Sequence, residues 1–155
     1  MERIIPATKE LTVEFDVQAA QNGHGELDVE FVDAKGQACS RIVLDSLGVM
    51  KVKGGPRFGT MLKNYKAGET YRVKAVLSTD MHAGTYYING KKVCQRQFDT
   101  PVEAITRVVF RTGPLFAEPN NETPADQYFD MPRADESDPV ATFSIANVKT
   151  YAADA

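Results

Sequence analysis

The fold is decided by the stretch Tyr86-Tyr87-Ile88-Asn89-Gly90-Lys91-Lys92-Val93. Its centre is Asn89-Gly90, and these two residue types tolerate the positive φ angles that a two-residue β-hairpin turn requires. Aromatic and β-branched residues before the turn favour an extended backbone. We therefore predict a tight hairpin, with Tyr87 and Lys92 on its two arms.

Two earlier segments show the period-two pattern of strands. Residues 11–18 read Leu-Thr-Val-Glu-Phe-Asp-Val-Gln, and residues 26–31 read Glu-Leu-Asp-Val-Glu-Phe. Alternation of this kind is typical of a strand that buries one face. Because residues 21–25 between them carry the signals of a turn, we predict that the two strands pair as a hairpin.

Further strands are expected between turn signals rich in glycine and proline, and no segment has the pattern of an amphipathic helix. They lie at about residues 41–44, 49–52, 58–62, 70–77, 105–111 and 141–151. Many short strands of this spacing predict an all-β fold, a two-sheet antiparallel β-sandwich. The expected core residues are Leu11, Val13, Phe15, Leu27, Val29, Phe31, Val73, Val108, Phe110, Phe143 and Ile145.

The length and composition fit one domain over residues 1–155, because a chain of this size buries roughly 70% of its unfolded surface. Its abrupt start in strand-like sequence suggests a segment excised from a longer chain. The net charge of −3 gives no overall attraction to nucleic acid, and the apolar runs are too short to span a membrane. We expect neither partner.

Residues 113–139 form a long acidic segment without alternation. A solvated loop is the simplest interpretation, and calcium ligation by some of its carboxylates is the alternative. The carboxylates lack the spacing of an EF-hand, so no cofactor is predicted. Cys39 and Cys94 lie on separate predicted strands and are either a disulfide across the sandwich or buried thiols.

Three segments carry a family resemblance. Residues 84–93, 26–33 and 141–151 resemble the hairpin, an early strand and the last strand of concanavalin A-like and laminin-G-like jelly-roll domains. Such domains are appended to bacterial polysaccharide-degrading enzymes. The resemblance implies a non-catalytic carbohydrate-binding or accessory module, with a glycan or a neighbouring domain as partner and an extracellular or periplasmic location. A purely structural interaction domain is the alternative.

Glu26, Asp28 and Glu30 offer a catalytic alternative. Their spacing resembles the Glu-x-Asp-x-Glu signature of laminarinase- and lichenase-type glycoside hydrolases. That resemblance implies Glu26 as nucleophile, Glu30 as acid/base and Asp28 as the group that tunes them. Against it, the chain has no tryptophan to line a cleft, and about 13 Å of extended backbone separates the two glutamates.

Arginines on two predicted strands suggest a basic stripe. Arg72 with Lys74, and Arg107 with Arg111, alternate with apolar residues and should point away from the core. If both strands share a sheet, the guanidinium groups could hold the carboxylates of an acidic glycan. In the alternative, the cations pair across strands with the carboxylates of Glu14, Asp16, Glu26, Asp28 and Glu30.

Sugar sites also use flat aromatic faces. The aromatic candidates are Phe58, Tyr65, Tyr86, Tyr87, Tyr128 and Phe129. Phe58 and Tyr65 flank a turn region after residues 54–57 that could form an exposed rim. Tyr86 and Tyr87 are neighbours on one strand and must face opposite sides, so one of them should be exposed or partly exposed. The predicted ligand-binding residues are Arg72, Arg107, Arg111, Phe58, Tyr65 and Tyr87.

Overall fold

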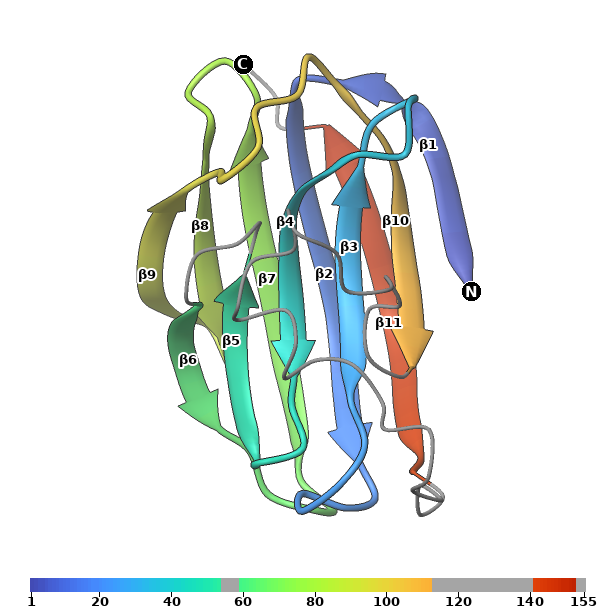
Figure 1. Ribbon diagram of the computed structural model, residues 1–155, viewed down its shortest axis with the longest axis vertical. Helices are drawn as coiled ribbons and strands as arrows, with labels where there is room; N and C mark the ends of the chain where they lie inside the picture. The colour runs from blue at the N-terminus through green and yellow to red at the C-terminus, as the bar shows by residue number, and fades with distance from the viewer. Residues whose placement is uncertain (54–58, 113–140, 153–155) are drawn as a thin grey trace, which may run out of the picture.

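The computed structural model describes residues 1–53, 59–112 and 141–152, which form two antiparallel sheets packed face to face (Figure 1). Within these residues there are strands and no helix, as predicted. The strands are β1 (Glu2–Thr8), β2 (Glu10–Ala19), β3 (Leu27–Val32), β4 (Ala38–Leu44), β5 (Val49–Lys53), β6 (Thr60–Asn64), β7 (Thr70–Ser78), β8 (Ala83–Ile88), β9 (Lys91–Gln97), β10 (Ile105–Thr112) and β11 (Phe143–Ala152).

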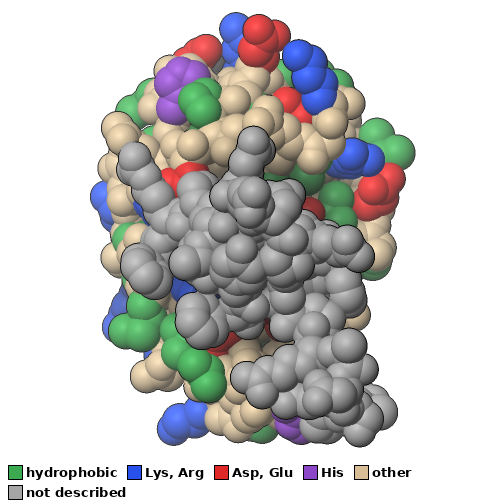
Figure 2. All heavy atoms as spheres, viewed as in Figure 1, with side chains coloured by type: hydrophobic (Ala, Val, Ile, Leu, Met, Phe, Trp, Pro, Cys, Tyr) green, Lys and Arg blue, Asp and Glu red, His purple; other side chains and the backbone are tan. Residues whose placement is uncertain are grey.

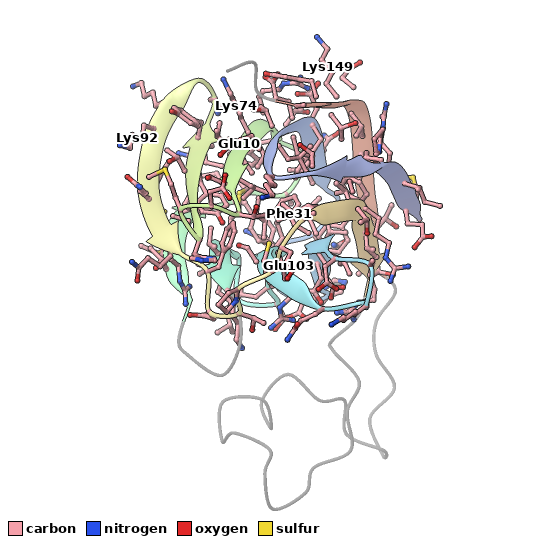
Figure 3. All side chains as sticks on the ribbon, turned by 90° about the horizontal axis from the view of Figure 1, so that it is seen from above. Glu10, Phe31, Lys74, Lys92, Glu103 and Lys149 are labelled. Carbon is pink, nitrogen blue, oxygen red and sulfur yellow. The ribbon has the colours of Figure 1, made fainter. Side chains whose placement is uncertain are left out.

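One sheet has six strands in the order β1-β10-β3-β4-β5-β6, and the other has five in the order β11-β2-β7-β8-β9. The six-stranded sheet lies in front in Figure 1. Seen from above, Phe31 points between the two layers, whereas Lys74 and Lys149 project from the five-stranded sheet into solvent (Figure 3). The predicted two-sheet antiparallel sandwich is therefore confirmed.

The predicted pairing of residues 11–18 with 26–31 is wrong. β2 pairs with β11 and β7, whereas β3 pairs with β10 and β4, so the connection between β2 and β3 crosses from one sheet to the other. Alternation reports only that a strand buries one face, and both sheets of a sandwich bury their faces in the same core. It therefore carries no information on which sheet holds the strand.

The sequence analysis did not predict β1, because residues 2–8 lack the alternating pattern of a half-buried strand. It is an edge strand beside β10, most of its residues are exposed, and its register slips between Ile4 and Thr8. Pro6 lies within that irregular stretch. Proline has no N–H to donate to a ladder, which confines it to edges and bulges.

The core between the sheets contains nine of the eleven residues predicted for it, and Phe15 packs edge to face on Phe110 with ring centroids 5.4 Å apart. Phe143 and Ile145 are only half-buried, which corrects the prediction for these two. β11 lies at the edge of its sheet, so one flank of each side chain reaches solvent. A buried polar bond also joins the sheets, between Ser40 Oγ and Tyr86 OH at 2.7 Å.

The two rings should therefore differ in their contribution to stability. We expect Phe110→Ala to lower the free energy of unfolding by about 3 to 5 kcal/mol. Phe143→Ala should cost roughly 1 to 2 kcal/mol, since part of its ring stays in water in the folded state. Urea unfolding measures both values, and equal losses would contradict the half-buried placement of Phe143.

The hairpin between β8 and β9 forms as predicted. Asn89 and Gly90 have φ angles of 52° and 84°, and Tyr87 pairs with Lys92 across the arms. The Asn89 side-chain oxygen accepts a hydrogen bond from the backbone N–H of Arg72 at 2.8 Å, which ties the turn to β7. The turn thereby fixes the register at one edge of the five-stranded sheet.

Gly90→Ala measures the free-energy cost of the positive φ angle in this turn without a steric clash, because a Cβ at Gly90 would meet no atom within 4 Å. We expect a loss of about 1 to 2 kcal/mol, the cost of placing an L-residue in the left-handed region. Gly23 is the matched control, with equal space for a Cβ and no positive φ. Gly23→Ala should leave the thermal midpoint nearly unchanged, and a similar loss in both variants would reject the assigned turn.

Candidate functional site

The predicted basic stripe does not form, because its arginines lie on opposite outer faces of the sandwich. Arg72 belongs to β7 in the five-stranded sheet, whereas Arg107 and Arg111 belong to β10 in the six-stranded sheet. The condition on which the stripe depended, one shared sheet, is not met. Each outer face therefore has to be considered as a site of its own.

Cross-strand pairing, the alternative for these cations, is confirmed for two of them. Arg72 Nη1 lies 3.2 Å from Asp16 Oδ1, and its Nη2 lies 3.8 Å from Glu14 Oε1. Arg111 Nη2 bonds to Asp28 Oδ2 at 2.9 Å and to Glu30 Oε1 at 2.7 Å. The guanidinium groups thus already neutralise carboxylates of the neighbouring strands.

Arg107 makes a weaker contact. Its Nη1 lies 3.5 Å from Glu2 Oε2, and both side chains are more than a third exposed. An exposed pair of this kind contributes little because water and salt screen it. Arg107 therefore lies at the margin of the six-stranded face.

The Arg111 cluster, which consists of Arg111, Asp28 and Glu30, is the more buried of the two ion-pair groups. The Asp28 side chain is 0% exposed and that of Glu30 is 15% exposed. Burial opposes the charge on Arg111, but the hydrogen bond to Glu30 and the nearby carboxylates together raise its pKa. The Arg111 guanidinium therefore stays charged on the outer face of the six-stranded sheet.

The same geometry bears on the catalytic alternative. Glu26 precedes β3, whereas Asp28 and Glu30 point outward from β3 and share one guanidinium. A retaining glycosidase needs a nucleophile and an acid/base that face each other about 5 Å apart over an open groove. Carboxylates that hold a common arginine are arranged to fix a cation, so the structure gives this alternative no added support.

Arg41 and Lys53 continue the charged face beyond the Arg111 cluster. In the sheet register Glu30 lies opposite Arg41, and Arg41 lies opposite Lys53. Because paired strands are about 4.8 Å apart, these three side chains stand next to one another on the outer face. Sequence reasoning missed Arg41, since it predicted only a strand at residues 41–44.

Arg41 is unusual in its surroundings. The residue is only 4% exposed, and among the residues that the structure describes it forms no ion pair within 4.0 Å. Its neighbour Glu30 is directed to Arg111 instead. A guanidinium in a residue with so little exposure, and without a carboxylate partner, favours an anionic ligand.

Of the predicted aromatic residues, Tyr65 is not on a rim. Tyr65 is 2% exposed, its OH donates a hydrogen bond to the backbone oxygen of Asp45, and burial with the nearby Asp45 and Glu26 charges raises its pKa to about 12. It belongs to the core, which corrects the expected placement. Phe58, Tyr128 and Phe129 lie outside the described residues.

Tyr86 and Tyr87 divide between the two sides of β8, as predicted. Tyr86 is buried in the core, and Tyr87 is half-buried on the outer face of the five-stranded sheet. Lys74 Nζ lies 5.2 Å from the centre of the Tyr87 ring. The ring face that a sugar would stack on is therefore in contact with a cation.

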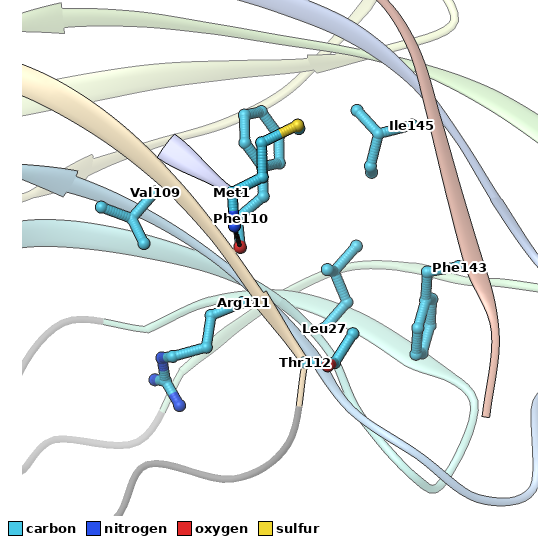
Figure 4. Close-up of a pocket in the computed structure, with 8 residues that line it drawn as sticks. All are labelled: Met1, Leu27, Val109, Phe110, Arg111, Thr112, Phe143 and Ile145. Atoms are coloured by element: carbon cyan, nitrogen blue, oxygen red, sulfur yellow. Dashed lines mark hydrogen bonds between the residues drawn. The ribbon is translucent and has the colours of Figure 1, made fainter. Parts of the chain in front are cut away.

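Charges of both signs are interspersed where side chains are visible around the face toward the viewer in Figure 2. An open cleft of about 630 Å³ lies between β10 and β11 (Figure 4), and its lining residues include Phe110, Leu27, Phe143, Ile145 and Arg111. A smaller depression of about 400 Å³ lies on the five-stranded face at Asp16, Arg72 and Asn147. Both are large enough for small ligands.

The remaining sequence predictions concern the two cysteines and the acidic segment. Cys39 and Cys94 are free thiols, and burial raises the pKa of Cys39 to about 12, so the disulfide alternative is not realised. The segment 113–139, proposed as a loop or calcium site, lies outside the described residues. In the described ranges no helix is long and apolar enough to cross a membrane.

Comparison with solved structures of low sequence identity identifies the fold of this sandwich. Sheep galectin-11, in a complex with glycerol, is 15% identical with a TM-score of 0.61, and the alignment covers 97% of this chain and 96% of that one. A sialidase of Trypanosoma rangeli in complex with 2,3-difluorosialic acid is 12% identical with a TM-score of 0.55, over 92% and 20% of the two chains. These likenesses establish the concanavalin-like jelly-roll fold.

The family follows from a sequence match. Residues 1–127 match the family model described as "Sialidase-like, CBM domain", and the chain therefore belongs to the sialidase-like carbohydrate-binding-module family. A solved structure described as a sialidase is 48% identical with a TM-score of 0.84, and the alignment covers 99% of this chain but 14% of that one. The search of curated proteins gives no significant match.

The Arg111 cluster offers a direct test of its buried ion pair. Arg111→Met should lower the free energy of unfolding by about 3 kcal/mol, because it removes a guanidinium from the buried Asp28 carboxylate. In the double variant, Asp28→Asn should recover part of this loss. Urea unfolding of the two single variants and the double variant measures the coupling energy between the two side chains, which should differ from zero.

The exposed Arg107 is the matched control for this cycle. Arg107→Met should change stability by no more than about 0.5 kcal/mol. Strictly additive effects of the Arg111 and Asp28 substitutions would contradict a direct ion pair between the two side chains.

Proposed function

We propose that this carbohydrate-binding module binds an acidic glycan on the outer face of the six-stranded sheet, with Arg41 as the residue that receives the negatively charged group. The observation that carries the proposal is the burial of Arg41 without an ion pair among the described residues. A guanidinium presents a planar fork of donors that matches a carboxylate through two hydrogen bonds. A uronic or other carboxylated sugar supplies that group.

The neighbours of Arg41 support the same ligand class. Lys53 stands beside Arg41 in the register and adds positive charge to this part of the face. On the other side, Arg111 holds the Glu30 carboxylate at 2.7 Å and keeps it from neutralising Arg41. The residues lie on paired strands rather than on loops, so their spacing is fixed before the ligand arrives, which lowers the entropic cost of binding.

An array of carboxylated, sulfated and neutral glycans tests this proposal. The wild-type domain should retain carboxylated glycans, and Arg41→Ala should weaken their binding roughly tenfold or more. Arg41→Lys should also weaken binding, because an ammonium lacks the planar fork. Added salt should lower the affinity of the wild type, since it screens the charges.

Two other arginines are controls for this array. Arg107→Gln alters an exposed pair at the margin of the same face, and Arg72→Gln alters the opposite face. Both variants should bind carboxylated glycans nearly as the wild type does. Retention of wild-type affinity by a folded Arg41→Ala variant would reject the proposal.

The glycoside hydrolase alternative makes a different prediction for the same panel. It requires the wild type to release sugar from at least one glycan, and Glu26→Gln and Glu30→Gln each to abolish that turnover. If the domain only binds, reducing-end assays should detect no product with the wild type. A structural role beside a neighbouring domain predicts neither binding nor hydrolysis.

The location follows from the ligand. A polysaccharide or a cell-surface glycan as partner implies an extracellular or periplasmic site of action. The sialidase that shares 48% identity contains this sandwich as 14% of its length, which supports a role beside a larger neighbouring part of a chain.

A further inference from the structure

The outer face of the five-stranded sheet carries a polar depression that the acidic-glycan site does not use. Its volume is about 400 Å³, and it is lined by Asp16, Arg72, Asn147, Val148 and Lys149. Arg41 belongs to the other sheet, so the two places lie on opposite sides of the core. One sugar unit cannot reach both.

The depression lies where β11 carries an irregularity in its pairing with β2. The register with β2 shifts between Ala146 and Lys149, and Asn147 has a φ angle of 53°. A positive φ is unfavourable for residues other than glycine, although asparagine tolerates it best. Within the shifted stretch Val148 packs against the core, while Asn147 stays exposed.

Hydrogen bonds hold the polar groups of the depression in fixed positions. Asn147 Nδ2 donates to Asp16 Oδ2 at 2.7 Å, and Arg72 Nη1 donates to Asp16 Oδ1 at 3.2 Å and to the Asn147 backbone oxygen at 3.0 Å. The bond from Asn147 is the main cause that lowers the pKa of Asp16, and Arg72 adds to it. Asp16 therefore stays an ionised acceptor well below neutral pH.

Further groups are available to a ligand. Among the described residues, Lys149 forms no ion pair within 4.0 Å, and its side chain projects outward from the sheet (Figure 3). The Asn147 side-chain oxygen accepts no hydrogen bond from another described residue, since its bonds run through Nδ2 and the backbone oxygen. The depression thus combines ionised and amide acceptors with an ammonium donor.

The charges around the depression balance. Arg72 and Lys149 are positive, and Asp16 and Glu14 are negative, with Glu14 Oε1 3.8 Å from Arg72 Nη2. A balanced site gives no advantage to an anionic ligand. A pair of adjacent hydroxyl groups fits better, because one hydroxyl can donate to a carboxylate while the other accepts from an ammonium.

We propose that this depression is a second ligand site, which binds a neutral sugar through two adjacent hydroxyl groups held by Asp16, Asn147 and Lys149. The site is independent of Arg41 and of the acidic-glycan proposal. A domain with both sites could hold two different glycans, or two parts of one long glycan, on opposite faces.

Titration of the full ¹⁵N-labelled chain followed by NMR tests this second site. The probes are the methyl glycosides of galactose, glucose, mannose and N-acetylglucosamine at millimolar concentrations. At least one of them should shift the backbone amides of Asn147, Val148 and Lys149 in a saturable way. If none of the four shifts these amides, the proposal fails.

Two variants and two controls localise the effect. Lys149→Met removes the ammonium but keeps the stem, and Asn147→Gly removes the amide while glycine tolerates the positive φ. Each should raise the Kd of the active glycoside roughly tenfold. Lys92→Met, elsewhere on the five-stranded sheet, and Arg41→Ala, on the six-stranded sheet, should leave that Kd unchanged.

The outcomes separate the two proposals. Wild-type affinity in both folded variants would overturn the second site, and so would loss of the neutral sugar in Arg41→Ala. Loss of acidic glycans alone in Arg41→Ala, with the neutral glycoside still bound, supports both sites. Failure of the acidic-glycan proposal would leave the titration of the second site unaffected.

Discussion

The contact between Phe15 and Phe110 is the constraint on which the rest of the structure depends. The two rings come from different sheets and meet edge to face, an arrangement that aromatic quadrupoles favour. Once these positions point inward, the period of two sends every second residue of the regular strands outward. The outward positions of β3 and β10 are then Asp28, Glu30 and Arg111, so the charged face is a direct consequence of the core packing.

Much of the fold was predictable because it depends on local patterns. The alternation in residues 11–18 and the Asn89-Gly90 turn are both local, and both gave correct elements. The sheet that each strand joins is decided by contacts far apart in sequence. Residues 11–18 and 26–31 show the same pattern, yet their strands lie in opposite layers.

The candidate site shows the same limit. The alternation correctly predicted that the side chains of Arg72 and Arg111 point away from the core. It did not predict that they point to opposite outer faces of the sandwich. Arg41 was missed for a different reason. Its neighbours Ile42, Val43 and Leu44 are buried on both sides of β4, so no alternation marks the outward side of that strand.

The two outer faces differ in how their cations are solvated. The Arg72 side chain is 28% exposed and has carboxylate partners, so both water and ion pairs stabilise its charge. Arg41 is only 4% exposed and, among the described residues, forms no ion pair within 4.0 Å. An anionic ligand therefore gains most at Arg41, while the balanced group around Arg72 gives a polar, uncharged ligand no electrostatic disadvantage.

The sandwich also dictates how glycans would meet the domain. Packed sheets lie about 10 Å apart, and outward side chains extend the separation of the two faces further. A single sugar unit touches one face, whereas a long or branched glycan can pass around an edge and contact both. Binding at two faces then becomes intramolecular after the first contact, so two weak sites give a long glycan an avidity that no monosaccharide can have. A module with weak sites on opposite faces would in this way distinguish a polymer from its free sugars.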